Sequence, residues 1–321
     1  MGENIRIGVT VGDPAGIGPE ITAKLLSDTE FYAAYPFIPV APESILDDAF
    51  KNILKIAAPD YEILKVAGIP AFKTEYGKHD PRYGDISMKS VKTAVESALA
   101  GKLDAVVTCP INKHSVALAG YPFPGHTEYL GHLTGSPDFS MMMASERVKV
   151  VLATTHLPLK DVSAVLTVDK VLKAIRNAHK SGVLFGKPEP EVAVCGLNPH
   201  AGDKGSLGDE ELSVIEPAIL KARSEGINAA GPYPSDTLFA HTDRFDIAVA
   251  MYHDQGLIPV KMDGFGKTVN ITLNIPIMRV SVDHGTAFDI AGKGLADPGS
   301  LKNAIKTAYK MVLSRADVRA D

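Results

Sequence analysis

The sequence predicts an α/β protein of two domains, each an α/β/α sandwich built around a largely parallel sheet. Short apolar runs rich in Val and Ile alternate along the chain with longer segments of helical periodicity. This alternation is typical of strands that helices bury on both faces. Most of the apolar runs end abruptly in glycine, proline or a polar cluster. The length of 321 residues suits two domains of common size.

The bulk composition argues against nucleic acid and membranes as partners. The net charge is -5 and charged residues make up 22% of the chain, so no basic surface is expected for nucleic acid or anionic lipid. Cys109 and Cys195, the two cysteines, follow apolar runs and are expected to pack as small hydrophobic residues. The sequence shows no secretion-type leader and no membrane-spanning run, so the expectation is a soluble cytoplasmic protein.

The first half of the chain begins with a strand, a glycine-rich loop and a helix. The elements predicted in this half are strands at 5–11, 37–41, 61–66 and 105–109 and helices at 19–33 and 85–101. Asp85 is the expected cap of the second helix. The glycine loop 12–18 lacks both the G-x-G-x-x-G fingerprint and a Walker lysine. It is therefore open to two interpretations, an anion-binding loop or a tight turn.

The second half repeats the same alternation and ends in a helix. The elements predicted there are strands at 148–154, 192–195, 247–251 and 269–282 and helices at 168–181, 208–225 and 300–315. Thr167 is the expected cap of the first of these helices. The stretch 247–289 holds two apolar runs that each end in a cluster containing His and Asp. We expect part of a functional site at these strand ends.

Three of the ten histidines directly follow a predicted strand. They are His156, His200 and His253, and the carboxyl ends of parallel strands meet at one edge of a sheet. Three imidazoles with an open position suit Zn²⁺ or a similar divalent ion. Acidic residues that would orient an imidazole or complete the coordination are Asp203, Asp236 and Asp254. The alternative is that each histidine is a hydrogen-bonded loop residue, since spacing this long is not a metal motif.

A second set of side chains suits an anionic substrate. Lys261, Asn270 and Arg279 lie in strongly apolar surroundings, where a charge needs a partner or a ligand. A partly exposed strand edge is the alternative. His126 and Thr127 follow a loop stiffened by two prolines, which suits either a ligand-directed side chain or a simple helix cap.

Taken together, these clusters resemble one family, the 4-hydroxythreonine-4-phosphate dehydrogenases of pyridoxal phosphate biosynthesis. The matching segments span nearly the whole chain: GDPAGIGPE (12–20), VTCPINK (107–113), FPGHTEYL (123–130), TTHLPLKDV (154–162), GLNPHAG (196–202), SDTLF (235–239), MYHDQGLIPVK (251–261), VNITL (269–273) and RVSVDHGTAFDIAGKGLADP (279–298). The loop 203–208 departs from the family pattern, which leaves the exact substrate open.

The resemblance implies a fold like that of isocitrate and isopropylmalate dehydrogenases. One domain would comprise 1–120 and 250–321, including the cofactor loop, and the other 121–249, with metal ligands and the dimerisation surface. The active site would lie in the interdomain cleft at a homodimer interface. One divalent ion (Zn²⁺, Mg²⁺ or Co²⁺) would be held in each site by His156, His200 and the partner chain's copy of His253. NAD or NADP would be the redox cofactor.

The resemblance also implies roles for the remaining residues. The substrate would be bound by His126, Thr127, Lys261, Asn270 and Arg279. Lys261 would act as the catalytic base, with Asp254 as the second candidate. The nucleotide would be bound by His284, Gly285, Thr286 and Asp289, an assignment that comes from the more distant isocitrate and isopropylmalate dehydrogenases.

The activity implied is a metal-dependent oxidation coupled to NAD(P)⁺. The substrate would be 4-phosphonooxy-L-threonine, oxidised at C3 to 2-amino-3-oxo-4-phosphonooxybutanoate, which decarboxylates to 3-amino-2-oxopropyl phosphate. One alternative is the same chemistry on D-threonate 4-phosphate, D-erythronate 4-phosphate or a cyclic diol dicarboxylate. Another is a metal-dependent lyase or hydrolase that uses no nicotinamide. A noncatalytic metal or metabolite sensor is a third.

Overall fold

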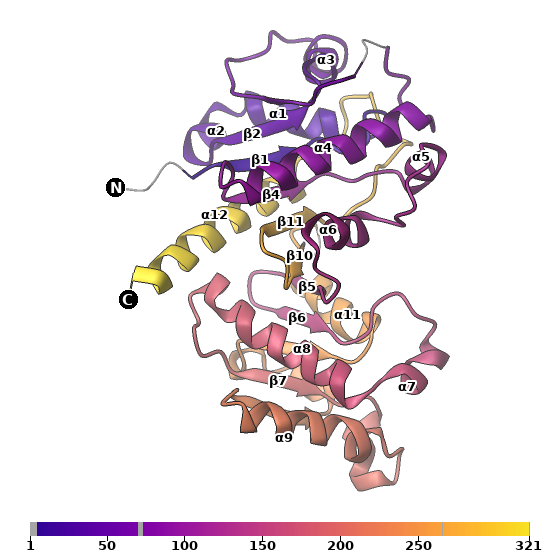
Figure 1. Cartoon of the computed structure of the whole chain (residues 1–321), viewed down its shortest axis with the longest axis vertical. Helices are drawn as coiled ribbons and strands as arrows, with labels where there is room; N and C mark the ends of the chain where they lie inside the picture. The colour runs from indigo at the N-terminus through magenta and orange to yellow at the C-terminus, as the bar shows by residue number, and fades with distance from the viewer. Residues whose placement is uncertain (1–4, 70–72, 265, 321) are drawn as a thin grey trace. The chain divides into compact units, whose positions relative to one another are not determined.

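The chain divides into two compact units, each containing strands flanked by helices (Figure 1). This computed structural model describes residues 5–69, 73–264 and 266–320. The first unit comprises Met1–Phe139 and Ile275–Val312, and the second comprises Ser140–Asn274 and Leu313–Asp321. The boundaries expected from the resemblance lie at 120/121 and 249/250. The segment 121–139 groups with the first unit because its helix packs against the long helix of that unit.

The first unit contains a parallel sheet. Its strands lie in the order β3-β2-β1-β4-β11. Their bounds are β1 Ile7–Thr10, β2 Phe37–Ala41, β3 Leu64–Lys65, β4 Ala105–Thr108 and β11 Met278–Val282. The chain leaves β1 for β2 on one side and returns to β4 on the other. The loops after β1 and β4 therefore meet at the point where the strand order reverses, which is where open α/β sheets bind ligands.

Helices surround this sheet, and α4 packs across β1 and β2 (Figure 1). The helices of the first unit are α1 Gly18–Ser27, α2 Thr29–Ala34, α3 Glu43–Asp48, η1 Ala49–Leu54, α4 Pro81–Leu99, α5 Lys113–Leu118 and α6 His126–Thr134. The last helix, α12, spans Gly299–Ala320. The helix predicted at 19–33 is divided in two because the Asp28 carboxylate accepts a hydrogen bond from the Phe31 backbone N–H and caps α2.

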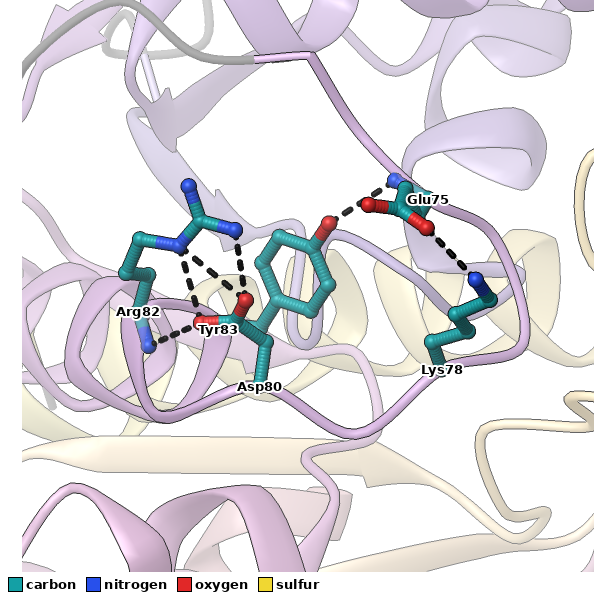
Figure 2. Close-up of polar contacts among 5 residues, drawn as sticks. All are labelled: Glu75, Lys78, Asp80, Arg82 and Tyr83. Carbon is teal, nitrogen blue, oxygen red and sulfur yellow. Dashed lines mark hydrogen bonds and ion pairs between the residues drawn. The ribbon is translucent and has the colours of Figure 1, made fainter.

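The start of α4 corrects one prediction, because Asp80 rather than Asp85 caps the helix (Figure 2). The Asp80 carboxylate accepts hydrogen bonds from the Arg82 backbone N–H at 2.7 Å and from its guanidinium. Pro81 follows at the first helical position, where its fixed φ suits the helix. The backbone N–H of Glu75 donates to the Tyr83 hydroxyl at 2.8 Å, so the loop before α4 is fixed at both ends.

The second unit contains a mixed sheet with a parallel half. Its strand order is β10-β5-β6-β9-β7-β8, and β6, β9, β7 and β8 run parallel. The bounds are β5 Ser140–Ala144, β6 Lys149–Leu152, β7 Val192–Cys195, β8 Ala229–Tyr233, β9 Ile247–Ala250 and β10 Val269–Leu273. The predicted α/β class with largely parallel sheets is therefore confirmed.

Helices cover both faces of the parallel half. The remaining elements are η2 Leu159–Asp161, α7 Val162–Val165, α8 Val168–Ser181, η3 Gly182–Phe185, η4 Pro199–Gly205, η5 Glu211–Ile215, α9 Glu216–Ser224, α10 Ser235–Leu238, η6 Thr242–Arg244 and α11 His253–Gly264. The longest of them, α8, packs across β6, β9 and β7 (Figure 1). Leu257 and Val260 of α11 join a core cluster with Val150, Leu152 and Ala248. Since side chains alternate along a strand, this cluster defines one face of the sheet.

The elements of the second half that differ from the prediction include α11, β5, β8 and the strands β10 and β11. The helix α11 was missed because Gly256 and Pro259 interrupt its helical pattern. The methionine-rich β5 was also missed. The single run predicted at 269–282 is two strands, because Asn274 turns the chain with a φ of 60°. Cys109 and Cys195 are buried and unpaired, as predicted. Among residues 5–69, 73–264 and 266–320, no helix is long and apolar enough to cross a membrane.

Candidate functional site

The carboxyl edge of the second sheet carries the three histidines singled out above. His156 follows β6, His253 follows β9 and His200 follows β7. In the sheet these strands are neighbours in the order β6-β9-β7, and all run parallel. The prediction that the three histidines lie beyond the same edge is therefore confirmed. His253 lies on the central strand of the three.

Two of these histidines lie together. The ring centroids of His156 and His253 are 5.6 Å apart, and the rings are inclined by 44°. The Nδ1 atom of His253 is 2.7 Å from a carboxylate oxygen of Asp254. A carboxylate only accepts, so in the neutral imidazole Nδ1 would carry the proton and Nε2 would keep the lone pair that a metal needs. This is the orienting contact expected of Asp254. Its action as a base stays a prediction.

His200 is carried by a separate loop, which follows β7. His200 lies in η4, where it has a φ of 55°, and its side chain is exposed. Within the described parts of the chain, no three His, Cys, Asp or Glu side chains are grouped so as to hold a metal ion. The chemistry of the donors still suits a divalent ion, because imidazole nitrogens are common ligands and Asp254 orients the ring of His253. The metal roles of all three histidines stay predictions.

Two side chains that the sequence did not single out connect the three loops. The Thr154 hydroxyl, next to the His156 loop, donates to the Met251 carbonyl at 2.7 Å. The Gln255 side-chain oxygen accepts from the Met251 backbone N–H at 2.6 Å, and its amide donates to the Gly196 carbonyl at 2.6 Å. The ends of β6, β9 and β7 are therefore joined by side-chain hydrogen bonds.

The second unit also contains Lys261 and Asn270. Lys261 lies on α11, the helix that begins at His253, and is half-buried. Asn270 lies in β10, opposite Met143 of β5, and is half-buried too. Asp203 and Asp236 are exposed. The substrate-binding roles of Lys261 and Asn270 stay predictions.

In the first unit, Arg279 is a buried cation. The residue is 2% exposed and is the second residue of β11. The guanidinium donates from Nε and Nη2 to the Thr108 hydroxyl at 3.1 and 2.7 Å. Burial lowers the pKa of Arg279 to about 9. A buried guanidinium of this kind gains most from an anion that accepts its hydrogen bonds.

His126 lies in the electrostatic field of Arg279. Burial and then the Arg279 charge lower the pKa of His126 well below its usual value, so the imidazole is neutral at pH 7. Its buried Nε2 atom has no hydrogen-bond partner in the part of the chain that the structure describes. A buried polar atom without a partner marks a place for a ligand. His126 and Thr127 begin α6, whose N-cap is Gly125, so neither is the helix cap.

The proposed nucleotide loop packs on the glycine loop after β1. The Thr286 carbonyl accepts a hydrogen bond from the Ile17 backbone N–H at 3.0 Å. His284 Nδ1 contacts the Gly285 carbonyl at 2.9 Å, and its buried Nε2 has no partner among the described residues. A Cβ at Gly12 would lie 2.2 Å from the Pro110 carbonyl oxygen. The glycine loop is thus a close-packed turn, which favours the second of the two interpretations.

A buried carboxyl group at the reversal point of the first sheet was not predicted. Asp13 is fully buried, and one of its oxygens accepts from the Ala15 backbone N–H at 2.8 Å. Burial raises its pKa to about 6 against the effect of that hydrogen bond. Nearby, Asn112 Oδ1 accepts from the Ser115 backbone N–H and contacts His79 Nδ1 at 3.1 Å. The sequence signal that could have identified Asp13 is the position of an acidic residue between a predicted strand and a glycine-rich loop.

Replacing Asp13 with Asn is expected to stabilise the protein in a pH-dependent way. The native state raises the pKa of Asp13 from 3.8 to about 6, so it binds this proton more tightly than the unfolded chain. Below pH 3.8 the Asp13 carboxyl does not lower the free energy of unfolding of the wild type. As the pH rises, this free energy falls, and the decrease is complete above pH 6, where it reaches on the order of 3 kcal/mol.

Urea unfolding of the wild type and Asp13→Asn at pH 5 and pH 8 measures this effect. The variant is expected to gain about 3 kcal/mol at pH 8 and about half of that at pH 5. Asp60→Asn, at an exposed position in the same unit, is the control and should show no such difference. An equal gain at both pH values would mean that Asp13 is not the group responsible.

Comparison with known proteins identifies relatives that match almost the full chain. A protein of Desulforapulum autotrophicum named 4-hydroxythreonine-4-phosphate dehydrogenase is 44% identical over 94% of this chain and 94% of the relative. A protein of Oceanobacillus iheyensis named as a D-threonate 4-phosphate dehydrogenase is 42% identical over 97% of this chain and 99% of the relative.

A solved structure agrees with these relatives. The 4-hydroxythreonine-4-phosphate dehydrogenase of Klebsiella pneumoniae has a TM-score of 0.88 at 36% identity, covering 97% of this chain and 99% of that one. The sequence profile of the family described as "Pyridoxal phosphate biosynthetic protein PdxA" matches residues 26–308. The chain therefore belongs to the PdxA family.

Proposed function

We propose that this chain is an NAD(P)-dependent dehydrogenase that oxidises 4-phosphonooxy-L-threonine at C3. The observation that carries the proposal is near-full-length membership of the family, together with its histidines on one sheet edge. The hydride on C3 of the substrate would be transferred to the nicotinamide, and the proton of the C3 hydroxyl would be transferred to a base. Loss of CO₂ from the 3-keto acid would then give 3-amino-2-oxopropyl phosphate.

The metal would be held by His156, His200 and His253. A divalent ion bound there supplies Lewis acidity toward the hydroxyl and the ketone formed from it. The contribution of this chain is the orientation of the ligands. Asp254 holds the proton of His253 on Nδ1 and leaves Nε2 available. Zn²⁺, Mg²⁺ and Co²⁺ are all candidates, and Lys261 on the same helix is the proposed base.

The charged ends of the substrate would be bound by Arg279, His126, Lys261 and Asn270. Arg279 offers a planar fork to the phosphate or carboxylate, and its burial makes such hydrogen bonds strong. The neutral His126 offers its Nε2, which no described residue contacts by a hydrogen bond. Thr127 would add a hydroxyl. Fixing both anionic ends selects which carbon meets the cofactor.

The nucleotide would be bound by the loop that runs from His284 to Asp289. The buried Nε2 of His284 supports this, because it lacks a partner in the described ranges of the chain. Gly285 and Thr286 would contribute backbone groups, and Asp289 is exposed. The dinucleotide supplies the hydride acceptor.

D-threonate 4-phosphate is the second candidate substrate, because one close relative is named for it. It differs from 4-phosphonooxy-L-threonine in carrying a hydroxyl instead of an amine at C2. The protein with each candidate metal and NAD⁺ or NADP⁺ is expected to produce reduced nicotinamide fastest from 4-phosphonooxy-L-threonine. We expect its kcat/KM to exceed that for D-threonate 4-phosphate by about 10-fold or more.

The absorbance of reduced nicotinamide, measured with a wider panel of substrates, tests the remaining candidate activities. D-erythronate 4-phosphate and a cyclic diol dicarboxylate belong in this panel. A preference for any of these would reassign the substrate within the family. No reduced nicotinamide from any of them would overturn the dehydrogenase proposal and favour a lyase or hydrolase.

We further propose that two copies of the chain form a homodimer through the surface beside α11. Ile258 and Met262 are one turn apart on this helix, and they are 58% and 83% exposed. They border a cavity of about 580 Å³ that Tyr252 and Asp254 also line. Large exposed apolar side chains around a hollow are typical of an association surface. This surface adjoins His253, as expected if His253 serves the site of the partner chain.

Mixing two inactive variants tests this arrangement. His253→Ala and His200→Ala are each expected to be inactive as homodimers. If His253 serves the partner site, subunit exchange restores one intact site in each mixed dimer, and about a quarter of the wild-type activity returns. If all ligands come from one chain, the mixture stays inactive.

A further inference from the structure

The loop that carries His200 is wound around a buried carboxylate. Glu211, at the start of η5, is 1% exposed. Its Oε1 atom accepts hydrogen bonds from the backbone N–H groups of Leu197 and Asn198, both at 2.7 Å. Its Oε2 atom accepts from the Asn198 side-chain amide at 3.0 Å. One carboxylate therefore satisfies three donors of the loop.

The backbone of this loop adopts an uncommon conformation. The φ angles are positive at His200, Ala201, Gly202, Asp203 and Lys204, with values of 55°, 52°, 79°, 42° and 56°. Residues other than glycine rarely adopt positive φ angles. Such backbone strain persists only where the surrounding structure maintains it. The direction of the His200 side chain therefore depends on whatever fixes the loop.

Two glycines show how closely the loop surrounds the carboxylate. A Cβ at Gly196 would lie 3.1 Å from Glu211 Oε1, and a Cβ at Gly202 would lie 2.6 Å from Oε2. The backbone thus approaches the same carboxylate four residues before His200 and two residues after it. Gln255 fixes the same Gly196 by donating to its carbonyl, so the loop is tied both to Glu211 and to the His253 segment.

We propose that Glu211 is a positioning residue that holds the His200 loop in the conformation required for metal binding. The inference rests on the proposed role of His200 as a ligand. Glu211 acts through the loop backbone and does not itself touch the ion. Groups that orient a metal ligand from outside the coordination shell commonly change affinity by about 10- to 100-fold when they are replaced.

Glu211→Gln changes this contact with little change in size. The Gln oxygen can still accept from both backbone N–H groups, but its amide then faces the Asn198 amide, donor against donor. The negative charge is lost as well. Glu210→Gln is the matched control. Glu210 contacts Asn198 and the Ser163 hydroxyl but accepts from neither backbone N–H that Glu211 holds.

The experiment is a Co²⁺ titration of the metal-free full-length protein, with amide hydrogen exchange of 196–208 measured in the same samples. Glu211→Gln is expected to bind Co²⁺ about 10- to 100-fold more weakly and to exchange faster in this loop without metal. Saturating Co²⁺ is expected to restore kcat, which a general loss of stability would not allow. Glu210→Gln should match the wild type in all three measurements.

Wild-type Co²⁺ affinity together with wild-type exchange in Glu211→Gln would overturn the inference. If that variant does not fold, Glu211→Asp replaces it, because the shorter carboxylate keeps the charge but cannot reach the same donors. Wild-type affinity in Glu211→Asp would overturn it equally. His200→Ala separates the two proposals: unchanged Co²⁺ affinity there removes the ligand role of His200, while loop exchange in Glu211→Gln still reports whether Glu211 anchors the loop.

Discussion

His200→Ala is expected to reduce metal-dependent turnover by about 10³-fold or more while the chain stays folded. The loss follows because a divalent ion contributes several kcal/mol to such a reaction, and removing one ligand weakens its binding. His200 is exposed on a surface loop, so its truncation leaves no cavity in the core. The measurements are turnover against metal concentration, bound metal content and circular dichroism.

His241→Ala is the matched control, because His241 is another exposed histidine of the same unit. It is expected to keep wild-type turnover and metal content. Full activity of His200→Ala in metal-stripped buffer would remove the metal from the proposed function. A loss of activity with unchanged metal content would leave His200 with a role other than ligation.

Arg279→Met is expected to separate substrate binding from stability. Burial lowers the pKa of Arg279 to about 9, which shows that the fold disfavours its charged form. Replacing buried ionic groups with apolar side chains of similar volume is often neutral or stabilising by about 1–4 kcal/mol where a whole ion pair is replaced, and we expect Arg279→Met to lie within that range. The same variant loses the fork that would bind phosphate or carboxylate, so KM should rise by about 10²-fold.

Urea unfolding and initial rates on one preparation measure both quantities. Arg279→Lys is the companion variant: it keeps the charge but not the planar fork, and we expect an intermediate KM. A variant Arg279→Met that is clearly destabilised and has an unchanged KM would assign Arg279 to the structure of β11 instead of to the substrate.

The sequence predicted correctly the features that depend on a single element or on the order of parallel strands. Strands such as β4 and β7 were predicted because a run of apolar residues is enough to bury them. The shared edge of His156, His200 and His253 was predictable because parallel strands place their carboxyl ends together. The helix α11 was not, since Gly256 and Pro259 weaken its pattern while packing against the sheet keeps it helical.

The supporting residues could not be predicted for a different reason. Their partners are set by the tertiary structure. Asp13 has its raised pKa because the fold buries it, and Gln255 matters because β7 lies beside β9. Glu211 looks like an ordinary acidic residue in a helical first turn until the loop before it folds back onto its carboxylate. For Gln255 and Glu211, nothing in residue type or spacing distinguishes them from solvated residues, whereas Asp13 carries only the weak signal of an acid placed before a glycine loop.

The discontinuous first unit has a consequence for synthesis on the ribosome. Its last strand, β11, pairs with β4 but is made only after the whole of Ser140–Asn274. Until then β4 presents an unpaired edge, and such edges invite misassembly. The inserted unit can complete its own strand pairing with β10 before β11 emerges. During translation the second unit should therefore complete its sheet first. The first unit, whose synthesis begins earlier, should complete its sheet last.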